Sequence, residues 1–228
     1  MLRLPLVLAL AAALAAGSAV AGDGDRPDSV DKVNGSITAQ AGQTYRDLST
    51  VNGSIRIEEG AHTEDASTVN GSIKVDDRAQ TRDMETVNGG IRLGREVQVD
   101  GSLETVNGEV FVDRGGRVSG GITTVNGAIG LVATELGRNI ETVNGDITVG
   151  VGSHVRGGIK IEKPTSNWMP ISFGRKQPPR IIIGPNATVD GSLVFEREVK
   201  LYVHRTAKIG PVTGATAVAY DGDRAPGD

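Results

Sequence analysis

Apolar residues recur along the chain with a period of 18 or 19 residues. The tripeptide Val-Asn-Gly marks this period, and it begins at Val33, Val51, Val69, Val87, Val106, Val125 and Val143. A fixed period of this size is typical of stacked supersecondary units. Isoleucine or valine stands four residues after each motif valine, and a further residue, almost always apolar, follows two positions later. Because side chains alternate with period two along a strand, these two positions share one face of a short β-strand.

A further apolar column stands three residues before the motif valine, as Leu48 does before Val51. This step of three breaks the period-two alternation, so it predicts a corner between the two residues. The segments are rich in β-branched residues, punctuated by glycine and without a 3.6-residue period, which excludes helix. The pattern predicts an all-β, single-stranded parallel β-helix (β-solenoid) of about nine rungs of 18–19 residues, with a triangular cross-section.

The general crossover rule favours a right-handed coil. An 18-residue period also fits left-handed hexapeptide solenoids, so both hands stay open at this point. With a spacing of about 4.8 Å between rungs, the body would be about 40 Å long.

Each motif valine is followed by Asn-Gly, a strong turn signal because both residues tolerate left-handed backbone geometry. The two longer coils add a residue beside Gly101 and Gly120, where a positive φ is expected for a wider bend. Stacked asparagine amides can also form hydrogen bonds along the axis. The sequence predicts such a structural ladder from Asn34, Asn52, Asn70, Asn88, Asn107, Asn126 and Asn144.

A threonine precedes most of the motif valines. If the strand alternation continues through Thr-Val-Asn, the threonines point outward beside the asparagines and form a flat array of hydroxyl and amide groups. Such a surface suits the binding of polymers, glycans or ice. The alternative is that the threonine and asparagine columns serve only the fold. The candidate binding face comprises Thr50, Thr68, Thr86, Thr105, Thr124 and Thr142.

The chain divides into four segments. Residues 1–21 have the pattern of a secretory signal peptide: Arg3, an apolar run from Leu4 to Ala16, and the small residues of Ala19-Val20-Ala21. The alternative, a membrane anchor, would need an apolar run of about 20 residues. Residues 22–32 form an acidic N-terminal cap or linker, residues 33–219 the solenoid, and residues 220–228 a polar tail that is expected to be disordered. The signal-peptide pattern predicts an exported protein, and no later segment could span a membrane. We therefore expect a periplasmic, extracellular or cell-surface location.

An insertion at residues 163–180 interrupts the coils. A loop of this length projects from one face of a solenoid. Its aromatic and basic residues form a candidate partner-binding loop, or alternatively a clasp packed against the flank; they are Trp168, Phe173, Arg175 and Lys176.

Composition and charge narrow the function further. The net charge of −4 argues against a nucleic-acid binder, and the absence of cysteine excludes disulfides and thiol chemistry. Histidines fall on separate rungs and form no catalytic constellation, so we expect no enzyme and no cofactor.

Four acidic residues stand at one bend of successive coils, namely Asp47, Asp65, Asp83 and Asp100. Their carboxylates could hold calcium. However, aspartate at a bend usually caps its own backbone, and arginines stand close by, so we expect no metal site. A short basic column should be a solvated face paired with nearby acids; it comprises Arg56, Lys74 and Arg92.

The repeated T-V-N-G-x-I-x-V pattern, from Val33 to Val151, resembles the bacterial putative-adhesin β-strand-repeat family. The stretches Ala187–Leu193 and Ala207–Gly210 resemble bactofilins, which are polymer-forming parallel β-helix proteins. These resemblances imply a parallel β-helix with a scaffold or surface role and no reaction. We therefore expect a non-enzymatic, adhesive or structural solenoid of the bacterial envelope that binds an envelope glycan or protein. The alternatives are a self-assembling scaffold and a polysaccharide-acting β-helix enzyme.

Overall fold

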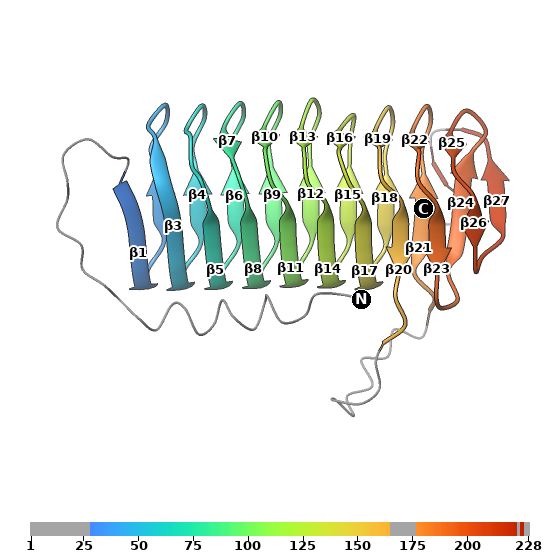
Figure 1. The fold of residues 1–228 in the computed structure, drawn as a ribbon, viewed down its shortest axis with the longest axis horizontal. Helices are drawn as coiled ribbons and strands as arrows, with labels where there is room; N and C mark the ends of the chain where they lie inside the picture. Colours follow the sequence, from blue (N-terminus) through green and yellow to red (C-terminus); the bar gives the residue numbers. More distant parts are fainter. Residues whose placement is uncertain (1–27, 165–176, 223, 226–228) are drawn as a thin grey trace.

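The computed structural model describes residues 28–164, 177–222, 224 and 225 of the chain. Every regular element within these residues is a β-strand, and the strands form three parallel sheets. The coils follow one another along the long axis of the molecule in sequence order (Figure 1). The first sheet has ten strands, so the chain makes about nine turns. The predicted parallel β-solenoid of about nine rungs is confirmed.

Each sheet takes one strand from successive coils. The first sheet comprises β1 (Asp28–Asn34), β3 (Tyr45–Asn52), β5 (Ala66–Asn70), β8 (Met84–Asn88), β11 (Leu103–Asn107), β14 (Ile122–Asn126), β17 (Ile140–Asn144), β20 (Ile159–Ile161), β23 (Leu193–Phe195) and β26 (Val212–Thr213). The second comprises β2 (Ile37–Ala39), β4 (Ile55–Ile57), β6 (Ile73–Val75), β9 (Ile91–Leu93), β12 (Val110–Val112), β15 (Ile129–Leu131), β18 (Ile147–Val149), β21 (Arg180–Ile183), β24 (Lys200–His204) and β27 (Ala217–Tyr220). The third comprises β7 (Gln80–Thr81), β10 (Gln98–Val99), β13 (Arg117–Val118), β16 (Glu135–Leu136), β19 (His154–Val155), β22 (Thr188–Val189) and β25 (Lys208–Ile209).

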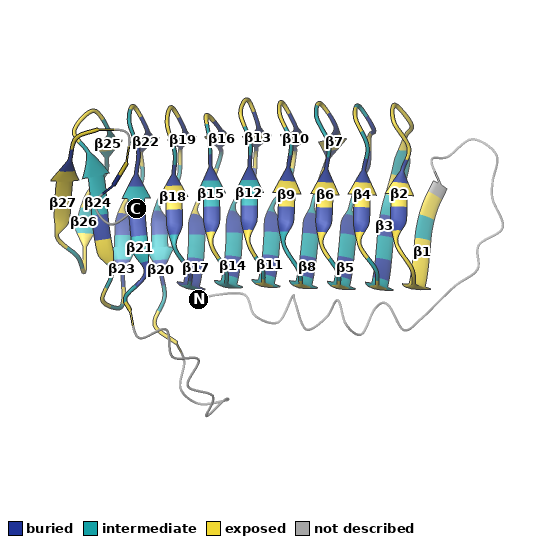
Figure 2. Cartoon of the chain, turned by 180° about the vertical axis from the view of Figure 1, so that it is seen from behind, coloured by how far each residue is buried: buried dark blue, intermediate teal, exposed yellow. Residues whose placement is uncertain are grey.

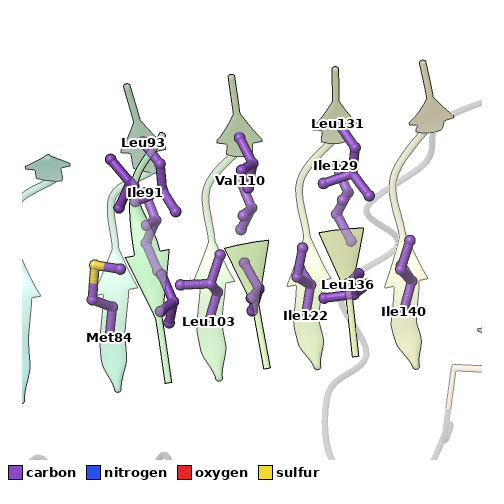
Figure 3. Close-up of a cluster of buried hydrophobic side chains, with 14 of the residues drawn as sticks. Met84, Ile91, Leu93, Leu103, Val110, Ile122, Ile129, Leu131, Leu136 and Ile140 are labelled. Carbon is purple, nitrogen blue, oxygen red and sulfur yellow. The ribbon is translucent and has the colours of Figure 1, made fainter. Parts of the chain in front are cut away.

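The core is a column of aliphatic side chains enclosed by the three sheets. Each sheet contributes two inner positions per coil, two residues apart, and the buried residues stand in rows along the axis (Figure 2). In the coil that begins at Leu48, the inner residues are Leu48, Thr50, Ile55, Ile57, Ala61 and Thr63. Figure 3 shows Met84, Leu103, Ile122 and Ile140 in one such row. Complete burial of a side chain of this size stabilises the fold by roughly 1.5–3 kcal/mol.

The predicted corner between Leu48 and Val51 is wrong. Strand β3 runs without a break from Tyr45 to Asn52, with Leu48 and Thr50 buried and Val51 facing outward. The turn into the second sheet comes after Asn52, at Gly53 and Ser54. The motif valine therefore belongs to the outer surface, because the period-two alternation continues from Leu48 to Val51. It ends there, since Asn52 is exposed at the end of the strand.

Close stacking, rather than left-handed geometry, explains the motif glycines. A Cβ atom on Gly89 would lie 2.0 Å from the carbonyl oxygen of Gly71 in the preceding coil. Among the motif glycines only Gly35 has a positive φ, so the expected left-handed Asn-Gly turn is wrong for the other six pairs. The same holds for Gly101, where a Cβ would meet the Asp83 carboxylate at 2.0 Å.

Left-handed residues occur instead at the turn between the second and third sheets. This turn places Gly60 at φ 67°, Arg78 at φ 58° and Ala133 at φ 44°. A residue with a Cβ is strained in this region by roughly 1–2 kcal/mol. The tertiary structure therefore holds several non-glycine residues in a conformation that glycine would adopt more easily.

The two ends of the solenoid differ from the predicted boundaries. Strand β1 begins at Asp28, so part of the expected cap is the first strand of the sheet. At the other end Tyr220 belongs to β27 and is buried, so the expected tail begins after it. Lys32 occupies the inner position of β1, opposite Thr50, and its Nζ donates to the carbonyl oxygen of Ser36 at 2.8 Å. An inward-pointing charge at an exposed strand edge disfavours the addition of another strand.

Candidate functional site

The outer face of the first sheet carries three columns of side chains, which we call the repetitive face. The central column consists of the motif valines Val51, Val69, Val87, Val106, Val125 and Val143. Toward the start of each strand lies a polar column of Ser49, Ser67, Glu85, Glu104, Thr123 and Glu141. On the other side lies the column of motif asparagines. The columns run along the axis because parallel, in-register strands place equivalent residues above one another.

The asparagine side chains form a continuous axial ladder. Each Nδ2 donates to the Oδ1 of the asparagine in the preceding coil, with six distances between 2.9 and 3.1 Å. The ladder comprises Asn34, Asn52, Asn70, Asn88, Asn107, Asn126 and Asn144. A primary amide has two N–H donors and two acceptor lone pairs. The ladder uses one of each in the inner members, so every coil keeps a donor and an acceptor for an external group.

Arg197 closes the ladder at its acceptor end. The last carbonyl of the ladder, Oδ1 of Asn144, accepts a hydrogen bond from Nη1 of Arg197. The same nitrogen donates to the backbone carbonyl of Val143 at 3.1 Å. Aligned amide dipoles accumulate negative charge at the carbonyl end, and a guanidinium there is favourable. The sequence analysis missed this residue, which takes the asparagine position of a later coil that lacks the motif.

The predicted outward orientation of the threonines is wrong. All six are buried, namely Thr50, Thr68, Thr86, Thr105, Thr124 and Thr142. The hydroxyls of the first four donate to the carbonyl oxygens of the motif glycines in the preceding coils, at 3.1, 2.9, 2.8 and 2.9 Å respectively. Since the hydroxyls face the core, they are not part of a surface that a ligand could reach.

The last two threonines of the column differ from the others. Thr124 and Thr142 are completely buried, and their hydroxyl oxygens have no hydrogen-bond partner among the described residues. An unpaired buried hydroxyl costs roughly 1–3 kcal/mol. In the next coil the same inner position is occupied by Ile161, which lies in register with Thr142. The column thus changes from a hydrogen-bonded to an apolar one toward the C-terminal end.

Two glutamates add a titratable group to the repetitive face. Glu85 and Glu104 stand in register on neighbouring coils. Partial burial, followed by the charges of Glu104, Asp83 and Asp65, raises the pKa of Glu85 to about 7. Burial and the Asp83 charge also raise the pKa of Glu104. Like charges on adjacent rungs repel each other, so this part of the face becomes less acidic near neutral pH than its composition indicates.

The acidic residues at the bend engage protein groups. Asp65 forms an ion pair with Arg82 at 2.5 Å, and Oδ1 of Asp83 accepts a hydrogen bond from the Ser102 amide at 2.7 Å. Within residues 28–164 and 177–222, no group of three or more His, Asp or Glu side chains is arranged to hold a metal ion. Capping and arginine pairing therefore account for Asp65 and Asp83.

The residues of the basic column on the second sheet are paired with nearby acids, as expected; Arg56 and Arg92 pair with an acid of the next coil, and Lys74 pairs with one of its own coil. Arg56 and Lys74 both contact Asp76, at 2.6 and 3.2 Å. Arg92 lies 3.5 Å from Glu109. The basic side chains of these pairs are exposed, so solvent screens the pairs and they contribute little to stability.

The candidate partner loop cannot be placed on any face. Its four residues, Trp168, Phe173, Arg175 and Lys176, lie outside the described residues. In the part of the chain that the structure describes, no helix is long and apolar enough to cross a membrane.

Comparison of the chain with protein families, with curated proteins and with solved structures gives no match. Inferences about function therefore rest on the geometry of the solenoid and its faces.

Proposed function

We propose that the protein is an exported, non-enzymatic β-solenoid of the bacterial cell envelope, which binds an extended glycan through the repetitive face. The observation that carries the proposal is the unbroken asparagine ladder, which runs through seven coils beside the valine column, whose members from Val51 to Val125 are half-buried and whose last member, Val143, is buried. The resemblance of the repeats to adhesin-like proteins and the signal-peptide pattern of residues 1–21 agree with this role.

The chemistry of the face suits a polymer of sugars. Each inner amide of the ladder offers one donor and one acceptor, which match the hydroxyl groups of a sugar ring. The valine column beside it offers an aliphatic surface to the C–H groups of the same ring. Because both columns repeat at about 4.8 Å along the axis, a chain lying parallel to the axis would meet the same pair of contacts on every coil.

A pair of substitutions on the valine column tests this assignment. Val87→Gln combined with Val106→Gln replaces two adjacent aliphatic contacts by longer polar side chains without a change of charge. The matched control is Thr38→Gln combined with Thr148→Gln, which alters two exposed, outward β-branched residues of the second sheet. Circular dichroism establishes that both variants retain the β-solenoid.

The assay is co-sedimentation of the purified protein with insoluble peptidoglycan. The wild-type protein and the control should sediment with the glycan, and the valine variant should bind at least about fivefold more weakly, since many small contacts of this type are lost together. Failure of the wild-type protein to sediment, or equal binding of the two variants, would show that the repetitive face is not a glycan-binding surface.

Export is tested separately from binding. When the full-length chain is expressed in a Gram-negative host, the protein should appear in the periplasmic or extracellular fraction with Gly22 as its first residue. A protein that keeps Met1 and stays in the cytoplasm would contradict export without affecting the binding assay.

A second candidate function, end-to-end assembly into a scaffold, is favoured by one end of the solenoid. Strand β27 is the last strand of the second sheet, and its Val218 is 51% exposed. Lys32 at the inner position of β1 disfavours continuation at the opposite end. Light scattering over a concentration series distinguishes the two functions: a constant monomer mass contradicts the scaffold, and filaments visible by electron microscopy support it.

A further inference from the structure

A small hollow lies on the outer face of the third sheet, between strands β13, β16 and β19. Its volume is about 260 Å³, and its rim is formed by Arg117, Ser119, Glu135 and Arg156. The floor includes the backbone of Gly137 and the buried residues Val118 and Leu136. The hollow is on a different sheet from the repetitive face, so an inference from it does not rest on the function proposed above.

The hollow lies beside a position that has no side chain. Ser119, Gly137 and Arg156 follow the buried Val118, Leu136 and Val155 of three successive coils. A Cβ atom on Gly137 would lie 2.2 Å from the carbonyl oxygen of Ser119, so the close approach of the two coils requires glycine. The recess beside this position is flanked by serine on one coil and arginine on the next.

The two arginines beside the recess both form long ion pairs with Glu135, and they keep most of their hydrogen-bonding capacity. Nη2 of Arg117 lies 3.5 Å and Nη2 of Arg156 lies 3.8 Å from Oε2 of Glu135. These distances exceed those of N–H···O hydrogen bonds, which are about 2.7–3.2 Å. Neither guanidinium forms a side-chain hydrogen bond within the described residues, and both side chains are 63% exposed. With two positive groups and one negative group, the rim carries a net positive charge.

Two acids flank the rim on the adjoining coils, since Asp100 and Asp190 occupy the positions equivalent to Ser119 and Arg156. Neither acid forms an ion pair with the two arginines among the described residues. His154 stands in register with Glu135 on the next coil, and its Nε2 lies 2.7 Å from Oδ2 of Asp190. That acid is therefore already engaged by a group outside the rim. The two guanidiniums remain the groups most available to an external anion.

We propose that the hollow binds the carboxylate of an acidic sugar residue. A guanidinium donates two parallel hydrogen bonds to a carboxylate, and two such forks here converge on one recess. Glu135 can accept hydrogen bonds from sugar hydroxyls, and the Ser119 hydroxyl can donate or accept. The volume is below the roughly 300 Å³ at which pockets begin to hold drug-sized ligands, which matches a single ring rather than several.

The test uses the full protein and isotope-labelled NMR titrations with D-galacturonate, D-galactose and acetate. Galactose lacks the carboxylate and acetate lacks the ring. Galacturonate should bind with a dissociation constant in the millimolar range, as is usual for a few exposed contacts, with shifts confined to β13, β16 and β19. Galactose and acetate should each bind at least about fivefold more weakly.

Two substitutions and a control assign the contacts. Arg117→Gln and Arg156→Gln should each weaken galacturonate binding about five- to tenfold, because each removes one charge-assisted fork. Arg95→Gln, an exposed arginine at a turn of another coil, should leave binding unchanged. Acetate binding as tight as galacturonate binding would reduce the site to a non-specific anion contact. No saturable galacturonate binding, or binding that survives both rim substitutions, would overturn the proposal.

Discussion

The buried threonine column offers a comparison between two chemically identical substitutions that should have opposite effects on stability. Thr86→Val removes a hydroxyl that donates to the Gly71 carbonyl at 2.8 Å. Thr124→Val removes a hydroxyl that has no partner among the described residues. Both side chains are buried, at 2% and 0% exposure, and both belong to the same column of the first sheet.

The magnitudes follow from the hydrogen bonds of each site. In Thr86→Val the Gly71 carbonyl loses its side-chain donor, which costs roughly 1–3 kcal/mol, while the additional buried methyl group returns about 0.8 kcal/mol. The net loss should be about 1 kcal/mol. In Thr124→Val no bond is lost and an unpaired buried hydroxyl is removed, so the free energy of unfolding should rise by about 1–2 kcal/mol. Ile161 at the equivalent position of a later coil shows that the column accepts an apolar side chain.

The assay is urea unfolding followed by circular dichroism. Because long repeat proteins can unfold in parts, the denaturant slope of each variant must equal that of the wild-type protein for the two free energies to be compared. The two variants should differ by about 2–3 kcal/mol. Changes of the same sign and similar size would refute the claim that the threonine hydroxyls of the early coils hold adjacent coils together.

The other predictions concern the two kinds of turn and the titratable pair. Ala133→Gly should raise the free energy of unfolding by about 0.5–1 kcal/mol, because φ is 44° at this exposed residue. Gly60→Ala, at φ 67°, should lower the free energy of unfolding by a similar amount. Effects of the same sign in the two variants would contradict the strain argument. Gly89→Ala should lower the free energy of unfolding by about 3 kcal/mol or more, as severe overpacking does, because the added Cβ would lie 2.0 Å from the Gly71 carbonyl oxygen. A melting temperature close to that of the wild type would disprove the close stacking. The pKa of Glu85 is raised from its ordinary 4.5 to about 7, so the protonated form favours folding; stability should fall as pH rises from about 4.5 to about 7, and Glu85→Gln should flatten this part of the pH profile. An unchanged profile in that variant would show that Glu85 does not titrate in this range.

The repeat period was sufficient to predict the fold because each coil obeys the same geometric rule. The isoleucine pairs such as Ile55 and Ile57 are separated by two residues, which identifies them as one buried face of a strand. Period and alternation together establish a parallel solenoid, since parallel in-register stacking is the arrangement that places equivalent residues above one another.

The orientation of Thr-Val-Asn could not be derived in the same way. Threonine and valine are both β-branched and fit either face of a strand. What decides between them is the hydrogen bond from a threonine hydroxyl such as that of Thr86 to a glycine carbonyl of the preceding coil. That partner is far away in sequence and comes close only when the coils stack. Continuing the alternation from Leu48 through β3 would have placed Thr50 inside, and this was the available signal.

The glycines illustrate a related difficulty. Asn-Gly indicates a turn, and a turn is present, but Gly89 is required by the carbonyl of Gly71 rather than by its own φ. A local signal can thus be correct about the position of a bend and wrong about the physical reason for it. The recess at Gly137 has the same origin and could be recognised only after the coils were aligned in space.

The central claim, that the repetitive face binds a glycan chain, is tested most directly by hydroxyl-radical footprinting of the protein alone and on peptidoglycan. The account predicts protection of the half-buried valines from Val51 to Val125, with no change at outward residues of the second sheet such as Thr38 and Thr148. Protection confined to the second or third sheet, or none in the bound state, would contradict it.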